Sequence, residues 1–123
     1  MIVGLGIDIV DIDRIQSKLE NNEILKEHIF SKSEINYCEK QRNKMEHYAA
    51  RFAAKEALLK ALGSGLNSEI KLNESEIVNE KSGKPLFNFM NESKKIIESG
   101  NYKILVSLSH TKNTACAVVI LTN

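Results

Sequence analysis

The stretch 46–62 constrains the fold most, because it consists largely of Ala, Leu, Lys and Glu. These residues have high helix propensity, since they lose little side-chain freedom in a helix and Ala loses none. Glycine follows at positions 63 and 65. Glycine commonly ends a helix, because it adopts a left-handed backbone conformation at little cost. The pattern therefore predicts one long helix over 46–62, closed by Gly63 and Gly65.

The first residues of the chain predict a strand. Positions 2–9 are rich in β-branched residues, and side chains along a strand alternate between its two faces. One face carries Gly4, Gly6 and Asp8. The other face carries four apolar residues, Val3, Leu5, Ile7 and Ile9. We expect the apolar face to pack into the core, and the glycine face to let a ligand or another backbone approach closely beside Asp8.

Turn residues and apolar runs predict four further strands. Short strands are expected at 76–79 and 86–89, on either side of a turn at 82–85. The chain closes with a predicted hairpin, whose arms are 102–109 and 114–121.

Three shorter helices are also expected. The first begins near Asp11 or Asp13, each a plausible N-cap. The second begins at a capping box formed by Ser31 and Glu34, and the third covers 92–99. Together with the strands, these elements predict an α+β fold, in which a mostly antiparallel sheet packs with one long helix.

Size and charge limit the function classes. The chain has 123 residues, which predicts a single domain over 1–123 with one core. Its net charge is +1, whereas proteins that bind nucleic acids usually have a clear basic excess. We therefore expect no nucleic-acid partner, and an acidic protein partner would have to be met by a local basic patch.

The location of the protein is also constrained. No apolar run is long enough to span a bilayer, and no basic segment precedes the apolar run at the start, as it would in a signal peptide. Cys38 and Cys116 lie far apart without a CxxC pattern, so we expect each to pack as a small apolar residue. We therefore expect a cytoplasmic protein without a membrane partner.

Glu56 and Lys60 are the first candidates for chemistry. Their spacing of four residues places both side chains on one face of the long helix. On spacing alone, a solvated ion pair on the helix surface is the more common interpretation. The same face, however, carries small and apolar residues, namely Ala49, Phe52, Ala53 and Gly63. Such residues seldom build a solvated face, so the pair is a candidate for a lined crevice.

Asp8 and His110 are weaker candidates, and each leaves two interpretations open. A strand-terminal aspartate often caps the following turn instead of binding a ligand. A lone histidine in a turn is more often an exposed polar residue than a catalyst. The hydroxyl groups of the surrounding segment 107–111 make His110 a better phosphate-facing candidate than His28 or His47.

These residue types suit phosphate chemistry when taken together. Carboxylate oxygens hold Mg²⁺, which prefers oxygen ligands and bridges phosphate groups. Lys, Arg and His neutralise phosphate oxygens as charge builds in the transition state. The residues therefore indicate a phosphate-handling enzyme without fixing its substrate.

Three blocks of residues, in this order and spacing, resemble the bacterial holo-acyl-carrier-protein synthases, the small phosphopantetheinyl transferases. They are GLGIDIV at 4–10, RFAAKEA at 51–57 followed by Lys60, Gly63 and Gly65, and SLSHT at 107–111. The segments IFSKSE at 29–34 and GKP at 83–85 also fit. The resemblance spans the whole chain.

The resemblance implies the 4'-phosphopantetheinyl transferase fold and an activity in fatty acid biosynthesis. That activity moves 4'-phosphopantetheine from coenzyme A to a serine of apo-acyl carrier protein and releases adenosine 3',5'-bisphosphate. It implies that Asp8 and Glu56 hold Mg²⁺ and that Lys60 lies against the pyrophosphate. Asp8, Glu56 and Lys60 would be the catalytic residues. The implied cofactor-binding residues are Arg51, Lys60, Gly63, His110 and Thr111. Arg14 would contact the acidic recognition helix of the carrier protein, with Lys18 one turn further along.

The resemblance also implies a homotrimer with active sites between neighbouring subunits, which would give a short chain a pocket for a large cofactor. Two other functions remain open from the residues. One is a different magnesium enzyme that acts on a nucleotide diphosphate without a carrier protein. The other is a non-catalytic module that binds acyl carrier protein or coenzyme A, which would not need Asp8 and Glu56 together.

Overall fold

The computed structural model of the chain describes residues 1–63 and 69–123, and it contains helices and strands. The described elements are β1 (Ile2–Asp11), α1 (Ile12–Leu19), α2 (Glu23–Ile29), α3 (Lys32–Glu39), α4 (Lys44–Leu62), the 3₁₀ helix η1 (Leu72–Glu74), β2 (Ser75–Asn79), β3 (Pro85–Phe89), α5 (Asn91–Ser99), β4 (Lys103–His110) and β5 (Thr114–Thr122). Gly65, which was expected to help end the long helix, lies outside the described residues.

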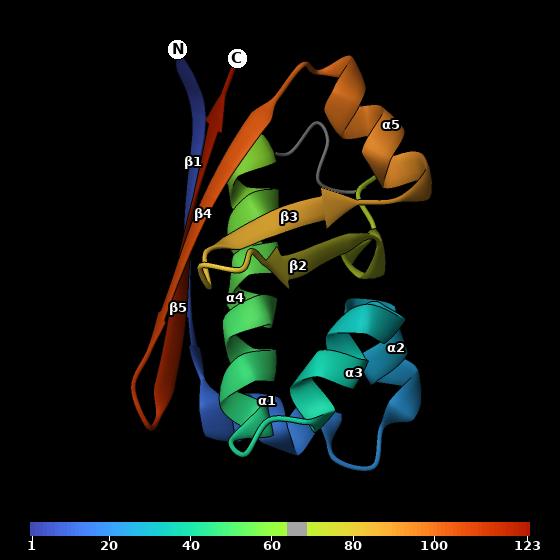
Figure 1. Cartoon of the computed structure of the whole chain (residues 1–123), viewed down its shortest axis with the longest axis vertical. Coiled ribbons are helices and arrows are strands. Elements are labelled where there is room, and N and C mark those ends of the chain that lie inside the picture. The colour runs from blue at the N-terminus through green and yellow to red at the C-terminus, as the bar shows by residue number, and fades with distance from the viewer. Residues whose placement is uncertain (64–68) are drawn as a thin grey trace.

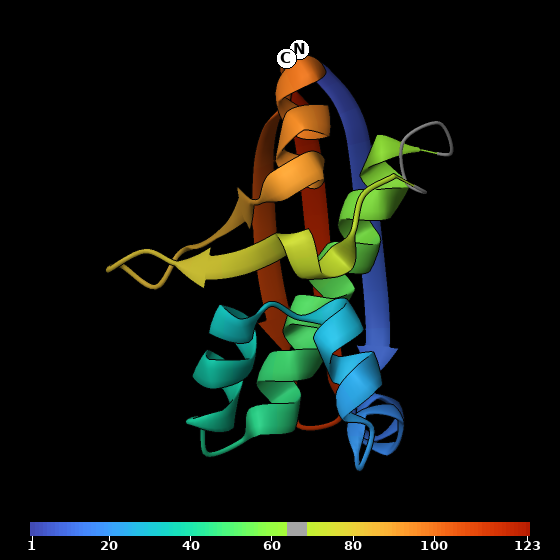
Figure 2. The same cartoon turned by 90° about the vertical axis from the view of Figure 1, so that its right-hand side faces the viewer.

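Two antiparallel sheets lie around α4 (Figure 1). The larger sheet has the strand order β1-β5-β4, and in it Asp8 lies opposite Ala117. The strands β2 and β3 form a hairpin that crosses α4, and Figure 2 shows this hairpin extending away from the long sheet. The mixed content and the antiparallel pairing confirm the predicted α+β class.

The glycine face of β1 packs against α4. A Cβ atom added at Gly6 would overlap the backbone carbonyl oxygen of Ala57, and one added at Gly4 would overlap that of Ala61. The helix presents alanines at these positions, so its backbone and that of the strand lie almost in contact. This close approach places the residues that follow Gly6 directly beside the helix, which is how Asp8 comes to lie near Glu56.

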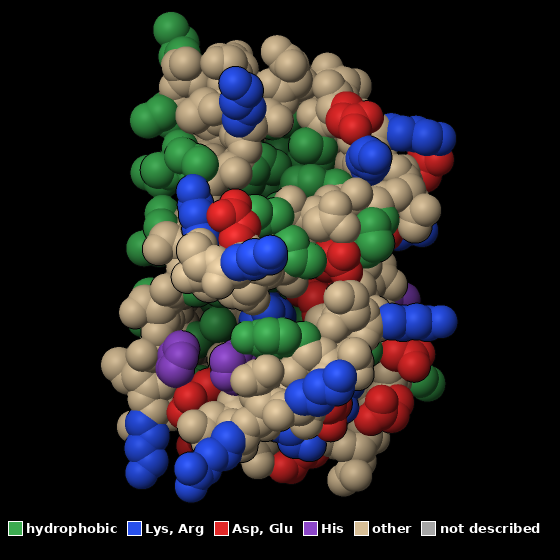
Figure 3. All heavy atoms as spheres, in the orientation of Figure 1, with side chains coloured by type: hydrophobic (Ala, Val, Ile, Leu, Met, Phe, Trp, Pro, Cys, Tyr) green, Lys and Arg blue, Asp and Glu red, His purple; other side chains and the backbone are tan. Residues whose placement is uncertain are grey.

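The prediction for the opposite face of β1 is wrong. Its side chains Val3, Leu5, Ile7 and Ile9 are 44%, 65%, 65% and 69% exposed, respectively. The predicted alternation is present, but α4 covers the glycine face. Only residues without a Cβ atom allow the backbones of strand and helix to lie this close together. The outer face of the sheet is therefore apolar and open, and Figure 3 shows hydrophobic side chains along the edge of the molecule where this sheet lies.

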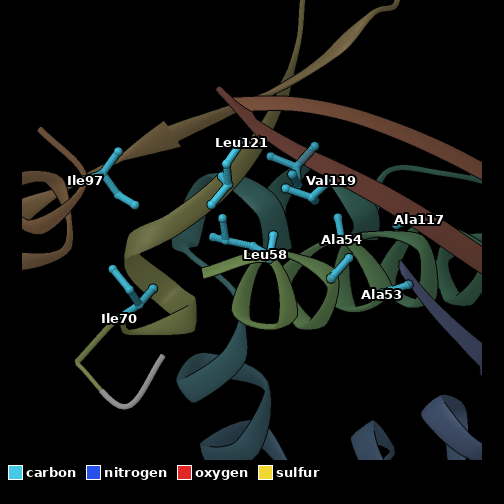
Figure 4. Close-up of a cluster of buried hydrophobic side chains, with 11 residues drawn as sticks. Ala53, Ala54, Leu58, Ile70, Ile97, Ala117, Val119 and Leu121 are labelled. Atoms are coloured by element: carbon cyan, nitrogen blue, oxygen red, sulfur yellow. The ribbon is translucent and has the colours of Figure 1, made fainter. Parts of the chain in front are cut away.

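The main hydrophobic core lies between α4 and the inner face of β5. Figure 4 shows Leu58 and Ala54 of the helix facing Val119 and Leu121 of the strand, with Ile97 of α5 nearby. A second cluster joins the start of α4 to α1, α2 and α3, and Cys38 is fully buried in it, as predicted. Both clusters use α4, so this helix connects the sheet to the three small helices.

A buried ion pair joins α4 to its neighbours. The ammonium of Lys55, whose side chain is fully buried, donates to the Glu34 carboxylate and to the carbonyl oxygens of Ile29 and Leu72. Glu34 also accepts hydrogen bonds from the backbone of Ser31 and Ile77. The capping box predicted for Ser31 and Glu34 is therefore confirmed, and its glutamate serves the interior as well.

Most predicted elements are present with small shifts at their ends. The long helix begins two residues earlier than predicted and ends at Leu62, as predicted. The helix α2 was missed, because its seven residues are too few to show a clear helical period. Within residues 1–63 and 69–123, no helix is both long enough and apolar enough to cross a membrane.

Candidate active site

A cleft lies where the end of β1 meets α1 and α4, and its volume is about 410 Å³. Four of the predicted site residues line it, namely Asp8, Arg14, Lys18 and Glu56. These residues come from three elements separated along the chain. The structure thus brings the two predicted metal ligands into one site with the two predicted partner-binding residues.

Asp8 is held in the cleft by an ion pair with Lys60. The Lys60 Nζ atom lies 3.0 Å from Asp8 Oδ1 and 3.0 Å from the carbonyl oxygen of Ile7, and it donates to both. The Asp8 side chain is 14% exposed and that of Lys60 is 56% exposed. Two interpretations were open for Asp8, namely ligand binding and capping of the next turn or helix. Capping is not supported, since Asp11 is the N-cap residue of the following helix, α1.

Glu56 lies one helical turn before Lys60 and faces the same cleft. Burial raises the pKa of its carboxyl group, and the nearby Asp8 carboxylate raises it further. Lys60 and Lys18 act in the opposite direction without cancelling the shift. The carboxylates of Asp8 and Glu56 therefore repel each other across a partly buried space, which favours binding of a cation between them.

The carboxylate pair fits Mg²⁺ better than it fits a metal held entirely by protein. Within the described parts of the chain, no three His, Cys, Asp or Glu side chains converge as a metal site. Mg²⁺ is usually bound by one or two carboxylates together with water and substrate phosphates. Asp8 and Glu56 supply the two carboxylates, and the open cleft leaves room for a phosphate group.

Arg14 and Lys18 form a basic rim on the cleft. The buried side of α1 consists of Ile12, Ile15 and Leu19, so the intervening polar positions face outward. Both basic residues line the cleft, and each is exposed to solvent. The predicted basic patch is therefore present next to the carboxylate pair.

The expectation of a lined crevice around Glu56 holds for part of the helix face. Phe52 lines the cleft, whereas Ala49 and Ala53 are fully buried in the core beneath it. Thr114 also lines the cleft and was missed by the sequence analysis. It pairs with Asp11 across the β1–β5 ladder, and this pairing is a long-range contact that local pattern does not reveal.

Arg51 lies apart from this cleft. It is 3% exposed, and its guanidinium group donates to Asn79 Oδ1 at 2.9 Å and lies 4.3 Å above the ring of Tyr37. Its Nε atom is buried and has no hydrogen-bond partner among the described residues. Arg51 therefore faces α3 and β2, on a different side of α4 from Glu56.

His110 and Thr111 lie at the turn between β4 and β5, also outside the cleft. The His110 Nδ1 atom is 3.6 Å from Glu46 Oε2, and its ring centre is 6.4 Å from that of His47. Two histidine side chains are visible side by side in Figure 3. Thr111 organises the turn, since its hydroxyl accepts from the backbone of Asn113 and Thr114.

His47 is a neighbour of His110 that its local sequence does not single out. Its ring packs edge-on against Tyr37 at 5.7 Å, so it bridges the surroundings of Arg51 and His110. Burial lowers the pKa of His47, and the nearby Arg51 and His110 side chains lower it further. The helical spacing of His47 and Arg51 was the only signal in the sequence that they share a face.

Gly63 ends α4, as predicted. It has a φ of +81°, and its backbone N–H donates to the carbonyl oxygen of Leu59. A left-handed backbone angle of this kind is strained for other residues, which explains the glycine.

Comparisons with known proteins agree with this fold. A family model for the 4'-phosphopantetheinyl transferase superfamily matches residues 4–119. The holo-[acyl-carrier-protein] synthase of Cytophaga hutchinsonii is 46% identical over 123 residues, which cover 98% of this chain and 97% of the relative.

Solved structures of synthases also resemble this chain. The enzyme from Neisseria meningitidis has a TM-score of 0.91 at 28% identity, with 100% of both chains covered. The enzyme from Bacillus anthracis, solved in complex with CoA (3',5'-ADP), has a TM-score of 0.80 at 36% identity, covering 98% of this chain and 96% of that chain.

The shared fold and the family match define the class as a small α+β group-transfer enzyme. The chain belongs to the 4'-phosphopantetheinyl transferase superfamily. The resemblance found in the sequence motifs is therefore confirmed.

Proposed function

We propose that this chain transfers the 4'-phosphopantetheine group of coenzyme A to a serine of apo-acyl carrier protein and releases adenosine 3',5'-bisphosphate. The observation that carries the proposal is the convergence of Asp8 and Glu56 in one cleft with a basic rim, where Lys60 forms an ion pair with Asp8. The names of the relatives support the same activity. Residues 1–123 would act as one transferase domain in the cytoplasm, in fatty acid biosynthesis.

Asp8 and Glu56 would hold Mg²⁺. Two features support this assignment. The two carboxylates repel each other, and a divalent cation offsets both charges. Carboxylate oxygens are also the ligands that Mg²⁺ prefers. When bound, Mg²⁺ neutralises charge on the diphosphate of coenzyme A. Lys60, which already lies at Asp8, would donate to the phosphate that departs with the nucleotide and stabilise its negative charge.

The reaction would be a direct transfer. The carrier serine oxygen attacks the β-phosphorus of coenzyme A and loses its proton to solvent, and the bond from that phosphorus to the bridging oxygen of the nucleotide breaks. A covalent enzyme intermediate would need an activated nucleophile. Burial raises the pKa of the Cys38 thiol to about 12, so this residue stays protonated and inert.

Arg14 and Lys18 would bind the acyl carrier protein. They form the exposed basic rim of the cleft, so an acidic helix docked on them would carry its serine to the carboxylate pair. Such charge complementarity accelerates encounter and excludes partners of the wrong sign. The near-neutral net charge of the chain makes this local patch necessary.

The positions of the proposed nucleotide-binding residues support a site shared between copies of the chain. His110 and Thr111 are exposed at the β4–β5 turn and do not line the cleft that contains Asp8, so they would serve the cleft of a neighbouring copy. Arg51 is almost fully buried, so it would not contact the nucleotide at the surface. It would instead add positive charge beneath His47 and His110. Gly63 would let the nucleotide approach the end of α4, since none of the described residues lies within 4 Å of its missing side chain.

A homotrimer would bring these parts together. The open apolar face of β1, formed by Val3, Leu5, Ile7 and Ile9, supports such an assembly, because patches of this kind usually mark interaction surfaces.

The activity is tested by mixing the chain with coenzyme A, Mg²⁺ and an apo-acyl carrier protein and weighing the carrier by intact-mass spectrometry. We expect a phosphopantetheine-sized gain that disappears with a chelator. Asp8→Ala and Glu56→Ala should each abolish the gain, whereas Glu98→Gln, an exposed carboxylate on α5, should leave it unchanged. Near-normal transfer by either of the first two variants would rule out the proposed metal ligands.

Carrier recognition has a separate test. Arg14→Glu should raise the KM for the carrier protein and leave binding of coenzyme A unchanged, because the reversed charge repels only an acidic partner. An unchanged KM would favour a magnesium enzyme that acts on a nucleotide diphosphate without a carrier. Binding of coenzyme A without any mass gain, on a carrier shown to be competent with another transferase, would favour the non-catalytic module.

A further inference from the structure

Lys60 makes a long-range contact instead of the one that its spacing predicts. A Glu–Lys pair four residues apart usually bonds along the helix. Here the ammonium of Lys60 lies within ion-pair distance of Asp8, from β1, and also binds the carbonyl oxygen of Ile7. In the described part of the chain, Glu56 has no basic side chain within ion-pair distance.

This contact places the lysine on a proposed metal ligand. The Asp8 oxygen that accepts from Lys60 belongs to the same carboxylate that would bind a divalent cation. A cation on that carboxylate would lie close to the ammonium, where like charges repel strongly in a partly buried site.

The two contacts at the end of β1 hold the ammonium, but its side chain is free to move. Lys60 is 56% exposed, and a lysine stem rotates about several carbon–carbon bonds. A diphosphate that enters the cleft would present phosphate oxygens to the ammonium group of Lys60. Together these oxygens carry more negative charge than one carboxylate. The lysine could then leave Asp8 without losing an ionic partner.

We infer that Lys60 and the divalent cation compete for Asp8, and that a diphosphate relieves this competition by accepting the ammonium. The cation and coenzyme A therefore bind cooperatively, with Lys60 as the group that couples them. This inference rests on the proposed function, because it takes Asp8 and Glu56 as the ligands of the cation.

The test measures Mn²⁺ binding to the full chain by calorimetry, with and without coenzyme A and without any carrier protein. Lys60→Met keeps most of the side-chain volume and removes the charge. Without coenzyme A, we expect this variant to bind Mn²⁺ about threefold to tenfold more tightly than the parent chain. This range is expected when one partly exposed ion pair is lost together with the repulsion between the ammonium group and the cation. The increase in Mn²⁺ affinity caused by coenzyme A should shrink by a similar factor.

Three variants serve as controls. Lys60→Arg keeps the charge and should bind Mn²⁺ as the parent chain does. Lys95→Met removes the charge of a lysine that pairs with Glu92 on α5, away from the cleft, and should change neither constant. Asp8→Asn should weaken Mn²⁺ binding, which locates the measured site.

The outcomes separate the two proposals. If Asp8→Asn weakens Mn²⁺ binding but Lys60→Met leaves it unchanged or weaker, the competition is wrong and the metal site stands. If Asp8→Asn binds Mn²⁺ as tightly as the parent chain, the proposed metal site is itself wrong.

Discussion

The carboxylate of Glu56 is kept in the cleft at a cost to stability. Its pKa is raised by burial and by Asp8, so the folded chain holds a proton on Glu56 more tightly than the unfolded chain does. A group with a raised pKa contributes most to folding below its unfolded pKa, and it loses that contribution as the pH rises through the folded pKa. At neutral pH, the ionised Glu56 therefore destabilises the fold.

Glu56→Gln should accordingly raise the Tm by a few degrees at neutral pH, because the amide removes the repulsion with Asp8. The gain should shrink as the pH falls through the raised pKa and vanish below the ordinary glutamate pKa of 4.5. Thermal unfolding followed by circular dichroism between pH 4 and 8 measures it. Glu98→Gln should show no such gain, and a Glu56→Gln variant less stable than the parent at neutral pH would contradict this account.

Lys55, the residue before Glu56 in the sequence, stabilises the fold. Its fully buried ammonium is satisfied by Glu34 and two carbonyl oxygens. Lys55→Met should lower the free energy of unfolding by about 3–5 kcal/mol, because it leaves the charge of Glu34 buried without a partner. Urea denaturation measures the loss.

A double variant separates charge from packing in this pair. Adding Glu34→Gln to Lys55→Met should recover part of the lost stability, since it removes the unpaired charge. If the double variant were less stable than Lys55→Met alone, the loss would come from packing and not from the buried charge.

At the scale of elements, the contact between β1 and α4 positions the whole site. Gly6 lies against the carbonyl of Ala57, so even a methyl group would push the strand away from the helix. Gly6→Ala should lower the free energy of unfolding by at least about 3 kcal/mol, the upper range for overpacking. It should also reduce transfer activity, because Asp8 moves with the strand.

Gly83 provides a comparison for this prediction. It has a φ of +91°, and within residues 1–63 and 69–123 no atom lies within 4 Å of its missing side chain. Gly83→Ala should therefore cost only the backbone strain of roughly 1–2 kcal/mol. Chemical denaturation compares the two variants, and equal losses would mean that the close approach of strand and helix is not the cause.

At the scale of the whole molecule, the open face of the sheet indicates how copies would meet. Light scattering after gel filtration should give the parent chain a mass three times its own 13.8 kDa. Leu5→Glu should lower this mass, because it places a charge on the apolar face at a residue that is 65% exposed. The same variant should lose transfer activity if His110 serves a neighbouring cleft.

Ile24→Glu is the matched control for the assembly. Ile24 is 75% exposed, but it lies on α2, away from the sheet. Its replacement should leave the mass unchanged. If Leu5→Glu keeps the mass of the parent chain, the outer face of β1 is not the interface between copies.

Features that depend on neighbours along the chain could be predicted from the amino-acid sequence. The propensities of 46–62 and the glycine at 63 predicted α4 to within two residues at its start. The spacing of Ser31 and Glu34 predicted a capping box, and the alternation in 2–9 predicted a strand. The motif blocks were enough to identify the family, since their order and spacing are linear properties.

Which surfaces meet depends on the packing of segments that are distant along the chain. Alternation gives β1 two faces but does not indicate which one is covered. The glycine face is covered because α4 can lie against its backbone. Lys60 pairs with Asp8 because strand and helix lie side by side. Arg51 stands beside Glu56 in the motif yet faces α3 and β2. Contacts of this kind depend on packing between distant segments, and local residue preferences contain no information about that packing.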